Sequence, residues 1–189
     1  MPATALDPRT ALVVIDLQKG LSAYPTVHPF RDIVATTARL ADAFRRAGLP
    51  VVLVTAGFSA DGGDAVHTRT DAGRRVMPTG PEFSELVPEL GPKAGDLLIK
   101  KRSPSAFYGT ELDLQLRRRQ VTGIVLTGVA TSIGVDATAR AAHERAYNVT
   151  IAADAVTDVD PAAHDFVMKK MFPRVAEIDA ADAILALLR

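Results

Sequence analysis

Short, continuous apolar runs alternate along the chain with stretches in which apolar residues recur at helical spacing. A continuous run such as 11–15 (ALVVI) is typical of a strand covered on both faces, whereas apolar residues three and four apart indicate the buried face of a helix. This pattern predicts strands at 11–15, 50–55, 96–101, 124–126, 148–153 and 174–178. Helices are predicted at 31–47, 110–119, 161–171 and 180–188, after the run at 124–126, and, as a short one, near 84–90.

Strands that alternate with helices imply βαβ units, which form a parallel sheet through right-handed crossovers. We therefore predict an α/β fold: a three-layer α/β/α sandwich, in one domain over 1–189, around a mostly parallel, Rossmann-like sheet of about six strands. Ligands of such sheets bind in a crevice where the strands reach their carboxyl ends. The residues to consider there are Asp16, Thr55, Lys100 or Lys101, 127–134 and Asp154.

The stretch 123–142 joins a predicted strand to a helix through the small residues Gly128, Ala130, Ser132 and Gly134. The first N–H groups of a helix lack partners within it, and the helix dipole favours negative charge, so this turn is expected to hold a substrate oxygen or carboxylate. The alternative is that small residues only let the helix and strand pack closely. The spacing of the glycines matches neither a phosphate-binding P-loop nor a GxGxxG dinucleotide motif.

Composition narrows the function classes. The 189 residues are 48% hydrophobic and 23% charged, which is ordinary for a globular protein. Because 22 basic residues balance 22 acidic ones, a nucleic-acid partner or an anionic membrane is disfavoured, and self-association is weakly favoured. No apolar segment has the length of a signal or a membrane span, so we expect a cytoplasmic protein.

The chain contains no cysteine, which removes disulfides, thiolate metal sites and a cysteine nucleophile. The four histidines show no metal-ligand spacing. The sequence therefore predicts neither a metal nor another cofactor.

The segment 57–95 has no strong periodicity and is dense in Gly, Pro, Asp and Thr, which is typical of a long functional excursion from the fold. Arg69, Arg74 and Arg75 lie in it. They are candidates to reach over the crevice and bind a carboxylate, although a plain surface role fits them equally well.

Charged residues end several predicted strands. Asp16 follows the first strand, where its carboxylate would lie on the floor of the crevice; the alternative is a turn or capping residue. Lys100 and Lys101 end the third strand and point in opposite directions, so only one faces the crevice. Asp154 is expected to be structural, as a cap or as a hydrogen-bonding partner of neighbouring loops.

Three separated motifs resemble those of the isochorismatase-like hydrolases, a family that includes isochorismatases, nicotinamidases and carbamoylsarcosine amidohydrolases. They are VVIDLQ at 13–18, KRSPSAFYGT at 101–110 and TGVATSIGV at 127–135, the last followed by TAR at 138–140. The motifs occur in the family's order and span nearly the whole chain. The resemblance implies the family's three-layer fold and a hydrolase that tends to form dimers or tetramers.

The resemblance also implies roles for individual residues. It makes Asp16 the catalytic acid, and it selects Lys101 over its neighbour as the catalytic lysine, since the family's lysine stands six residues before Phe107. The position of the family's cysteine nucleophile is occupied by Gly134. Ser132 lies two residues away and does not substitute for it, so attack by a thiol is not available to this chain.

The same resemblance implies a cis peptide bond between Val129 and Ala130 and an oxyanion or anion site formed by the backbone of these two residues, Thr131 and the glycine at the nucleophile position. Phe107 and Tyr108 are candidates to wall the substrate pocket, although an aromatic pair after a strand is as often core packing.

Three functions remain open at this stage. The first is hydrolysis of a vinyl ether in a small anionic metabolite, with Asp16 as proton donor and Lys101 balancing charge. The second is hydrolysis of an amide or ester by water that Asp16 activates. The third is a non-catalytic scaffold that binds a metabolite.

Overall fold

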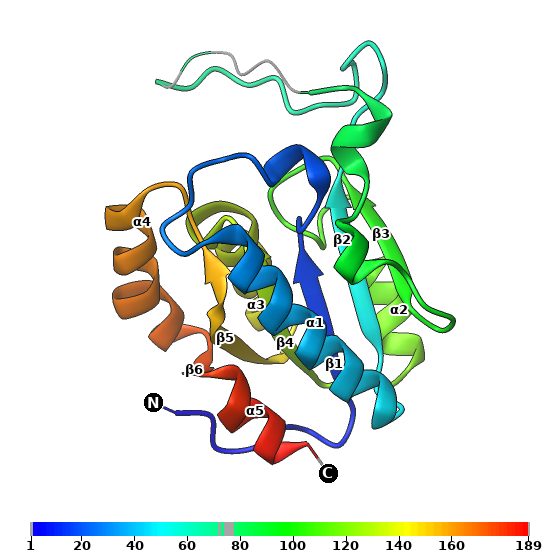
Figure 1. Cartoon of the computed structure of the whole chain (residues 1–189), viewed down its shortest axis with the longest axis vertical. Helices are drawn as coiled ribbons and strands as arrows, with labels where there is room; N and C mark the ends of the chain where they lie inside the picture. The colour runs from blue at the N-terminus through cyan, green and yellow to red at the C-terminus, as the bar shows by residue number, and fades with distance from the viewer. Residues whose placement is uncertain (1, 72, 74–77, 189) are drawn as a thin grey trace.

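The structure, a computed structural model, describes residues 2–71, 73 and 78–188. Its centre is a six-stranded sheet in which every pair of neighbouring strands is parallel, in the order β3-β2-β1-β4-β5-β6. Figure 1 shows the strands running side by side between the helices. The strands are β1 (Thr10–Ile15), β2 (Val51–Ala56), β3 (Leu97–Lys101), β4 (Gly123–Val129), β5 (Asn148–Thr157) and β6 (Glu177–Asp179).

The strand order places a topological switch point between β1 and β4. The chain builds outward from β1 through β2 to β3, and then starts again on the other side of β1 with β4. In open parallel sheets, ligands bind outside the carboxyl ends of the strands at this point. The residues that follow β1 and β4 therefore occupy the place where a site is expected.

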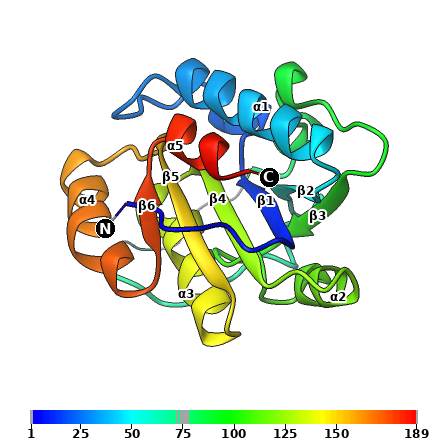
Figure 2. The same ribbon diagram turned by 90° about the horizontal axis from the view of Figure 1, so that it is seen from below.

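Helices cover both faces of the sheet, as the view along the layers shows (Figure 2). On one face, α1 and α5 pack against an apolar cluster that includes Leu12, Val14 and Val125. On the other face, α2, α3 and the helical segment that follows α4 pack against a second cluster that includes Val13 and Leu126. The helices are α1 (Phe30–Arg46), α2 (Leu112–Arg118), α3 (Asp136–Glu144), α4 (Pro161–Phe166) and α5 (Ala181–Leu187).

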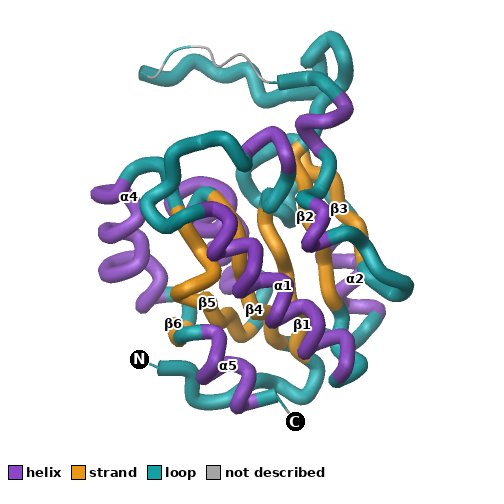
Figure 3. The backbone as a smooth tube through the Cα atoms, in the orientation of Figure 1, coloured by secondary structure: helices purple, strands orange, loops and turns teal. Residues whose placement is uncertain are grey.

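The excursion between β2 and β3 contains neither helix nor strand over its described residues from 57 to 80 (Figure 3). It leaves the sheet on the carboxyl-end side of the strands and extends away from the body of the molecule (Figure 1). The short helix predicted near 84–90 is wrong. Two separate 3₁₀ turns, Pro81–Ser84 and Pro88–Leu90, stand there, because Pro88 has no N–H with which to continue a helix.

Two further elements differ from the sequence-based expectation. The last strand is Glu177–Asp179 rather than 174–178, since a 3₁₀ turn occupies Phe172–Arg174. The chain enters α3 through a π-helical turn, Thr131–Val135, instead of a regular helix start. No helix among the described residues is long and apolar enough to cross a bilayer.

Candidate active site

Asp16 and Lys101 meet at the carboxyl ends of β1 and β3. The Lys101 Nζ lies 2.7 Å from Asp16 Oδ2 and donates a second hydrogen bond, of 2.9 Å, to the carbonyl oxygen of Pro104. Both side chains are almost fully buried, at 3% and 9% exposure. Lys100, the neighbouring candidate, is exposed. The structure thus brings together the two charged residues that the sequence singled out.

The Asp16 carboxylate is only partly satisfied. Its Oδ1 is buried and has no hydrogen-bond partner among the described residues, an uncommon state for a buried oxygen. Burial raises the pKa of the Asp16 carboxyl, and this outweighs the opposing effect of the Lys101 ammonium. The backbone of Asp16 has φ 55°, a left-handed conformation that aspartate tolerates better than most residues.

Gly134 faces the Asp16 carboxylate directly. A Cβ at this position would lie 3.3 Å from Asp16 Oδ2, 3.2 Å from the carbonyl oxygen of Val129 and 3.0 Å from Ile15 Cγ2. Such contacts are tight but within reach of a small adjustment. The position therefore adjoins the ion pair, with little room between the turn and the carboxylate for a side chain.

Gly128 lets β4 approach β1 at this end of the sheet. It pairs with Ile15 and has φ 116°, and a Cβ on it would lie 1.9 Å from the Ile15 carbonyl oxygen. No side chain fits there. Only glycine allows this close contact between β4 and β1, after which the chain enters the π-helical turn next to Asp16.

The turn after β4 is more fully hydrogen-bonded than the sequence suggests. The N–H of Ser132 donates to Asp158 Oδ2 at 2.6 Å, and the N–H groups of Ile133 and Val135 both donate to the carbonyl oxygen of Ala130, each at 3.1 Å. The expectation of a row of unpaired N–H groups is therefore wrong for these three. The peptide bond between Val129 and Ala130 is cis.

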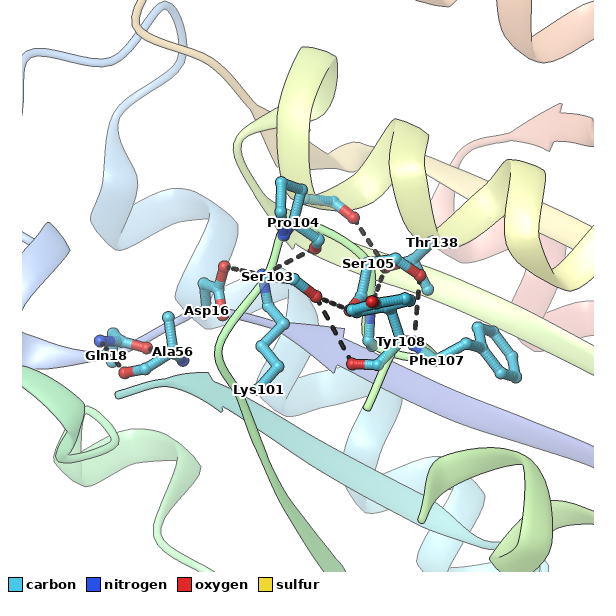
Figure 4. A network of polar contacts seen from close by, with 12 residues as sticks. Asp16, Gln18, Ala56, Lys101, Ser103, Pro104, Ser105, Phe107, Tyr108 and Thr138 are labelled. Carbon is cyan, nitrogen blue, oxygen red and sulfur yellow. Dashed lines mark hydrogen bonds and ion pairs between the residues drawn. The ribbon is translucent and has the colours of Figure 1, made fainter. Parts of the chain in front are cut away.

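A hydrogen-bonded loop connects Lys101 to this turn (Figure 4). Thr138, in α3, accepts a hydrogen bond from the Ala106 N–H at 3.0 Å and donates one to the Gly134 carbonyl oxygen at 2.7 Å. Its hydroxyl thereby ties the loop that carries Pro104 to the turn that carries Gly134. Thr138 was part of a recognised motif, but this bridging role was not predicted.

Gln18 holds the two ends of the excursion against β1. Its side-chain oxygen accepts from the Ala56 N–H at 2.8 Å, and its amide nitrogen donates to the carbonyl oxygens of Ala56 and Phe83 at 3.1 and 2.6 Å. Its backbone forms an isolated antiparallel bridge with Leu86. Sequence reasoning missed this residue as an individual contributor, although it lies two positions after Asp16 in a quoted motif.

Phe107 and Tyr108, the candidates to wall the pocket, lie in different environments. Phe107 is buried in the core, with its ring 5.8 Å from the ring of Tyr147 and 5.1 Å from the Arg145 guanidinium. Tyr108 is 74% exposed. The core-packing alternative therefore describes Phe107.

The arginines of the excursion are candidates that the described residues cover only in part. Arg74 and Arg75 lie outside the described residues, and Arg69 is exposed. Asp154 accepts a hydrogen bond from the N–H of Ala181 at 2.7 Å, at the start of α5, which confirms its structural role.

A buried polar pair that the sequence did not predict connects the turn Thr131–Val135 to α4. The Thr131 hydroxyl lies 2.9 Å from His164 Nδ1, and both side chains are buried. The pair joins the turn to α4, although 33 positions separate the two residues. Among the described residues, no group of three or more His, Asp or Glu side chains is arranged to hold a metal ion.

Comparisons with known proteins identify the family of the chain. The family model described as "Isochorismatase domain" matches residues 10–182. The uncharacterized isochorismatase family protein YecD of Escherichia coli O157:H7 is 40% identical, over 93% of this chain and 94% of its own length.

Solved structures show the same fold. An isochorismatase family protein from Burkholderia thailandensis has a TM-score of 0.95 and 43% identity, with 97% of each chain covered. The N-carbamoylsarcosine amidase from Thermoplasma acidophilum has a TM-score of 0.76 and 32% identity, over 92% of this chain and 97% of its own. With the strand order, the domain match and these relatives in agreement, the chain belongs to the isochorismatase family of hydrolases.

Proposed function

We propose that this chain hydrolyses a vinyl ether in a small anionic metabolite without forming a covalent intermediate. Asp16 is the proton donor, and Lys101 binds the substrate's carboxylate. The proposal rests above all on one observation: a buried carboxylate has one oxygen paired with an ammonium and the other oxygen without a partner.

The pKa of Asp16 supports the role of a general acid. A proton donor works best when its pKa approaches the operating pH, and burial raises the pKa of this carboxyl. Without a substrate, the Lys101 ammonium opposes this rise in the pKa of Asp16. A substrate carboxylate that pairs with Lys101 weakens this opposition and excludes water, so the substrate itself strengthens the acid.

The reaction then balances as follows. Asp16 transfers its proton to the terminal methylene carbon of the vinyl ether, which leaves an oxocarbenium-like carbon next to the ether oxygen. Water adds to that carbon and loses a proton, which returns to Asp16. The resulting hemiketal breaks its bond to the ether oxygen, releasing an alcohol and a keto acid, which is pyruvate when the substrate is isochorismate.

Glycine at the nucleophile position fits this route. A cysteine side chain at position 134 would occupy the space in front of Asp16 Oδ2, as the 3.3 Å contact of a Cβ indicates. Glycine at position 134 keeps a side chain from crowding the carboxylate there. We propose the N–H groups of Thr131 and Gly134 as those that hold a substrate oxygen, since three other N–H groups of the turn have partners.

A second candidate is hydrolysis of an amide or ester by water that Asp16 activates. It is favoured by the 32% identity to a carbamoylsarcosine amidase over most of both chains. It requires an ionised Asp16 as base, a state that the Lys101 ammonium stabilises and that burial opposes.

We also propose that the protein forms a homo-oligomer, a dimer or a tetramer. The net charge is zero, and Val159 and Phe166, near the carboxyl ends of the strands, are 51% and 58% exposed. Light scattering after size-exclusion chromatography tests this; a monomer at micromolar concentration would contradict it.

The function is tested by giving the purified protein isochorismate and measuring pyruvate, beside a panel of N-carbamoyl amino acids monitored for ammonia. The proposal predicts pyruvate release by the wild type at least about 100-fold above Asp16→Ala, the usual contribution of a general acid. Ammonia from the panel without pyruvate would favour the amidase. If neither pyruvate nor ammonia exceeds the level of the Asp16→Ala control, the chain is better described as a non-catalytic scaffold that binds a metabolite.

A further inference from the structure

A hollow lies on the described chain away from the candidate active site. It has a volume of about 810 Å³ and is formed where β1, β2, β3 and β4 begin, on the side from which Figure 2 is viewed. Its lining includes Arg9, just before β1, and Val51, the first residue of β2. None of its residues belongs to the Asp16–Lys101 ion pair or to the turn after β4. Its volume is in the range of small-molecule sites.

The lining is strongly positive. It holds three arginines, Arg9, Arg45 and Arg119, against a single carboxylate, Asp96. Asp96 is already taken: Arg45 binds it with Nε at 3.1 Å and Nη2 at 2.7 Å, and the N–H of Lys93 donates to it at 2.8 Å. The Arg45–Asp96 pair is thus a fixed, neutral part of the wall.

The other two arginines have no carboxylate partner within salt-bridge distance among the described residues. Both are exposed. Arg9 Nη1 lies 3.5 Å from the carbonyl oxygen of Arg119, so the two residues adjoin one another, and Arg119 Nη1 donates to Gln115. The nearby Asp7 carboxylate accepts from Asn148 instead and does not line the hollow.

The rest of the lining leaves room for a ligand. Gly48 and Gly95 border the hollow, and a Cβ on either would meet no atom within 4 Å. Leu49, Pro50 and Val121 give the lining an apolar part. The hollow therefore combines two positive charges that have no carboxylate partner, two glycines with free space beside them and an apolar surface.

We propose that this hollow binds a dianionic small molecule of the phosphate monoester class, at a site separate from the catalytic one. Arginine guanidinium groups match phosphate oxygens through paired N–H donors. Arg9 and Arg119 bind the phosphoryl group, and the apolar part of the lining contacts the organic group of the ester. The lone carboxylate stays bound to Arg45 and does not compete with the ligand.

The probes are phenyl phosphate, inorganic phosphate and neutral phenol, each titrated into the ¹⁵N-labelled full chain in about 0.15 M salt, where unspecific surface attraction is screened. The proposal predicts that phenyl phosphate shifts the amide signals of Gly48 and Gly95, binds more tightly than inorganic phosphate, and that phenol causes no shift. Shifts at Gly134 with none at Gly48 and Gly95 would overturn it, because the anion would then occupy the catalytic site.

Two matched double variants distinguish binding in the hollow from unspecific attraction to the charge of the protein. Arg9→Gln/Arg119→Gln should weaken phenyl phosphate binding at least tenfold. Arg31→Gln/Arg174→Gln removes the same charge from exposed arginines outside the hollow and should change it less than twofold. Equal weakening in both variants would overturn the proposal. All four arginines are exposed, so both variants are expected to fold, which a thermal melt checks.

Discussion

Gly134 and Asp16 face each other so closely that a single added methyl group at position 134 would lie 3.3 Å from the Asp16 carboxylate. The two residues come from turns after different strands, β4 and β1, which are neighbours at the switch point of the sheet. This contact places position 134 beside the buried ion pair. It also makes position 134 a place from which the charges of the site can be measured.

A thiol placed at position 134 should report the Lys101 charge. Because the chain has no cysteine, Gly134→Cys contains one thiol only. Adding Lys101→Met removes a positive charge next to Asp16 and should raise the pKa of this thiol by about one unit. The pKa is read from the pH dependence of alkylation by iodoacetamide.

The matched control for this thiol is Ser132→Cys, two residues away. Its pKa should respond to Lys101→Met by much less than that of the thiol at position 134. Equal shifts at both positions, or no shift at either, would show that position 134 does not adjoin the ion pair.

The ion pair should behave as one unit in stability measurements. Asp16→Asn leaves the buried Lys101 ammonium without its carboxylate and is expected to cost about 3 kcal/mol in free energy of unfolding. The double variant Asp16→Asn/Lys101→Met removes both charges and should cost less than the sum of the single variants by about 2 kcal/mol. Urea unfolding of the four proteins gives this coupling; additive effects would mean that the two groups do not interact.

Thr138→Val should destabilise the protein by about 1–3 kcal/mol. It removes a buried hydroxyl that accepts from Ala106 and donates to Gly134, and it leaves both backbone groups without that partner. Thr122→Val, at an exposed threonine, is the control and should change the free energy of unfolding by less than about 0.5 kcal/mol. Similar effects of the two changes would argue against the bridging role.

His164 should make stability fall as the solution becomes acidic. Burial, with a smaller contribution from the nearby His28, lowers the pKa of His164 from its usual 6.5. The folded chain therefore binds this proton less tightly than the unfolded chain does. The free energy of unfolding should decrease as pH falls from about 6.5 to the lowered pKa, and should be independent of this group above that window.

Urea titrations between pH 5 and 8 measure this dependence. His164→Gln should flatten the slope of stability against pH in this range, whereas His143→Gln, at an exposed histidine of α3, should leave it unchanged. A slope that survives in His164→Gln would assign the acid sensitivity to other groups.

The sequence predicts the parallel strands and the charged residues at their carboxyl ends. Continuous apolar runs identify parallel strands, and the carboxyl ends of such strands meet at one edge of the sheet, so Asp16 and Lys101 could be expected to lie close together. The six-stranded α/β/α architecture is confirmed for the same reason.

Loop directions and long-range polar contacts were not predictable. Phe107 follows β3 in a loop whose course no periodicity defines, and its ring packs in the core. The contact of Thr131 with His164 joins residues that share no local pattern. Gln18 forms its bonds with backbone atoms of Ala56, at the end of β2, and of Phe83, which any side chain there would leave in place.

The central claim, proton donation from Asp16 to carbon, is tested most directly by hydrolysing isochorismate in D₂O and recording the mass spectrum of the pyruvate formed. Carbon protonation by Asp16 predicts pyruvate with one deuterium in its methyl group and no enolpyruvate in the early spectra, from the wild type and not from Asp16→Asn, since released enolpyruvate would also take up one deuterium as it ketonises. Pyruvate formed at an undiminished rate by Asp16→Asn, or no pyruvate from the wild type, would contradict the account.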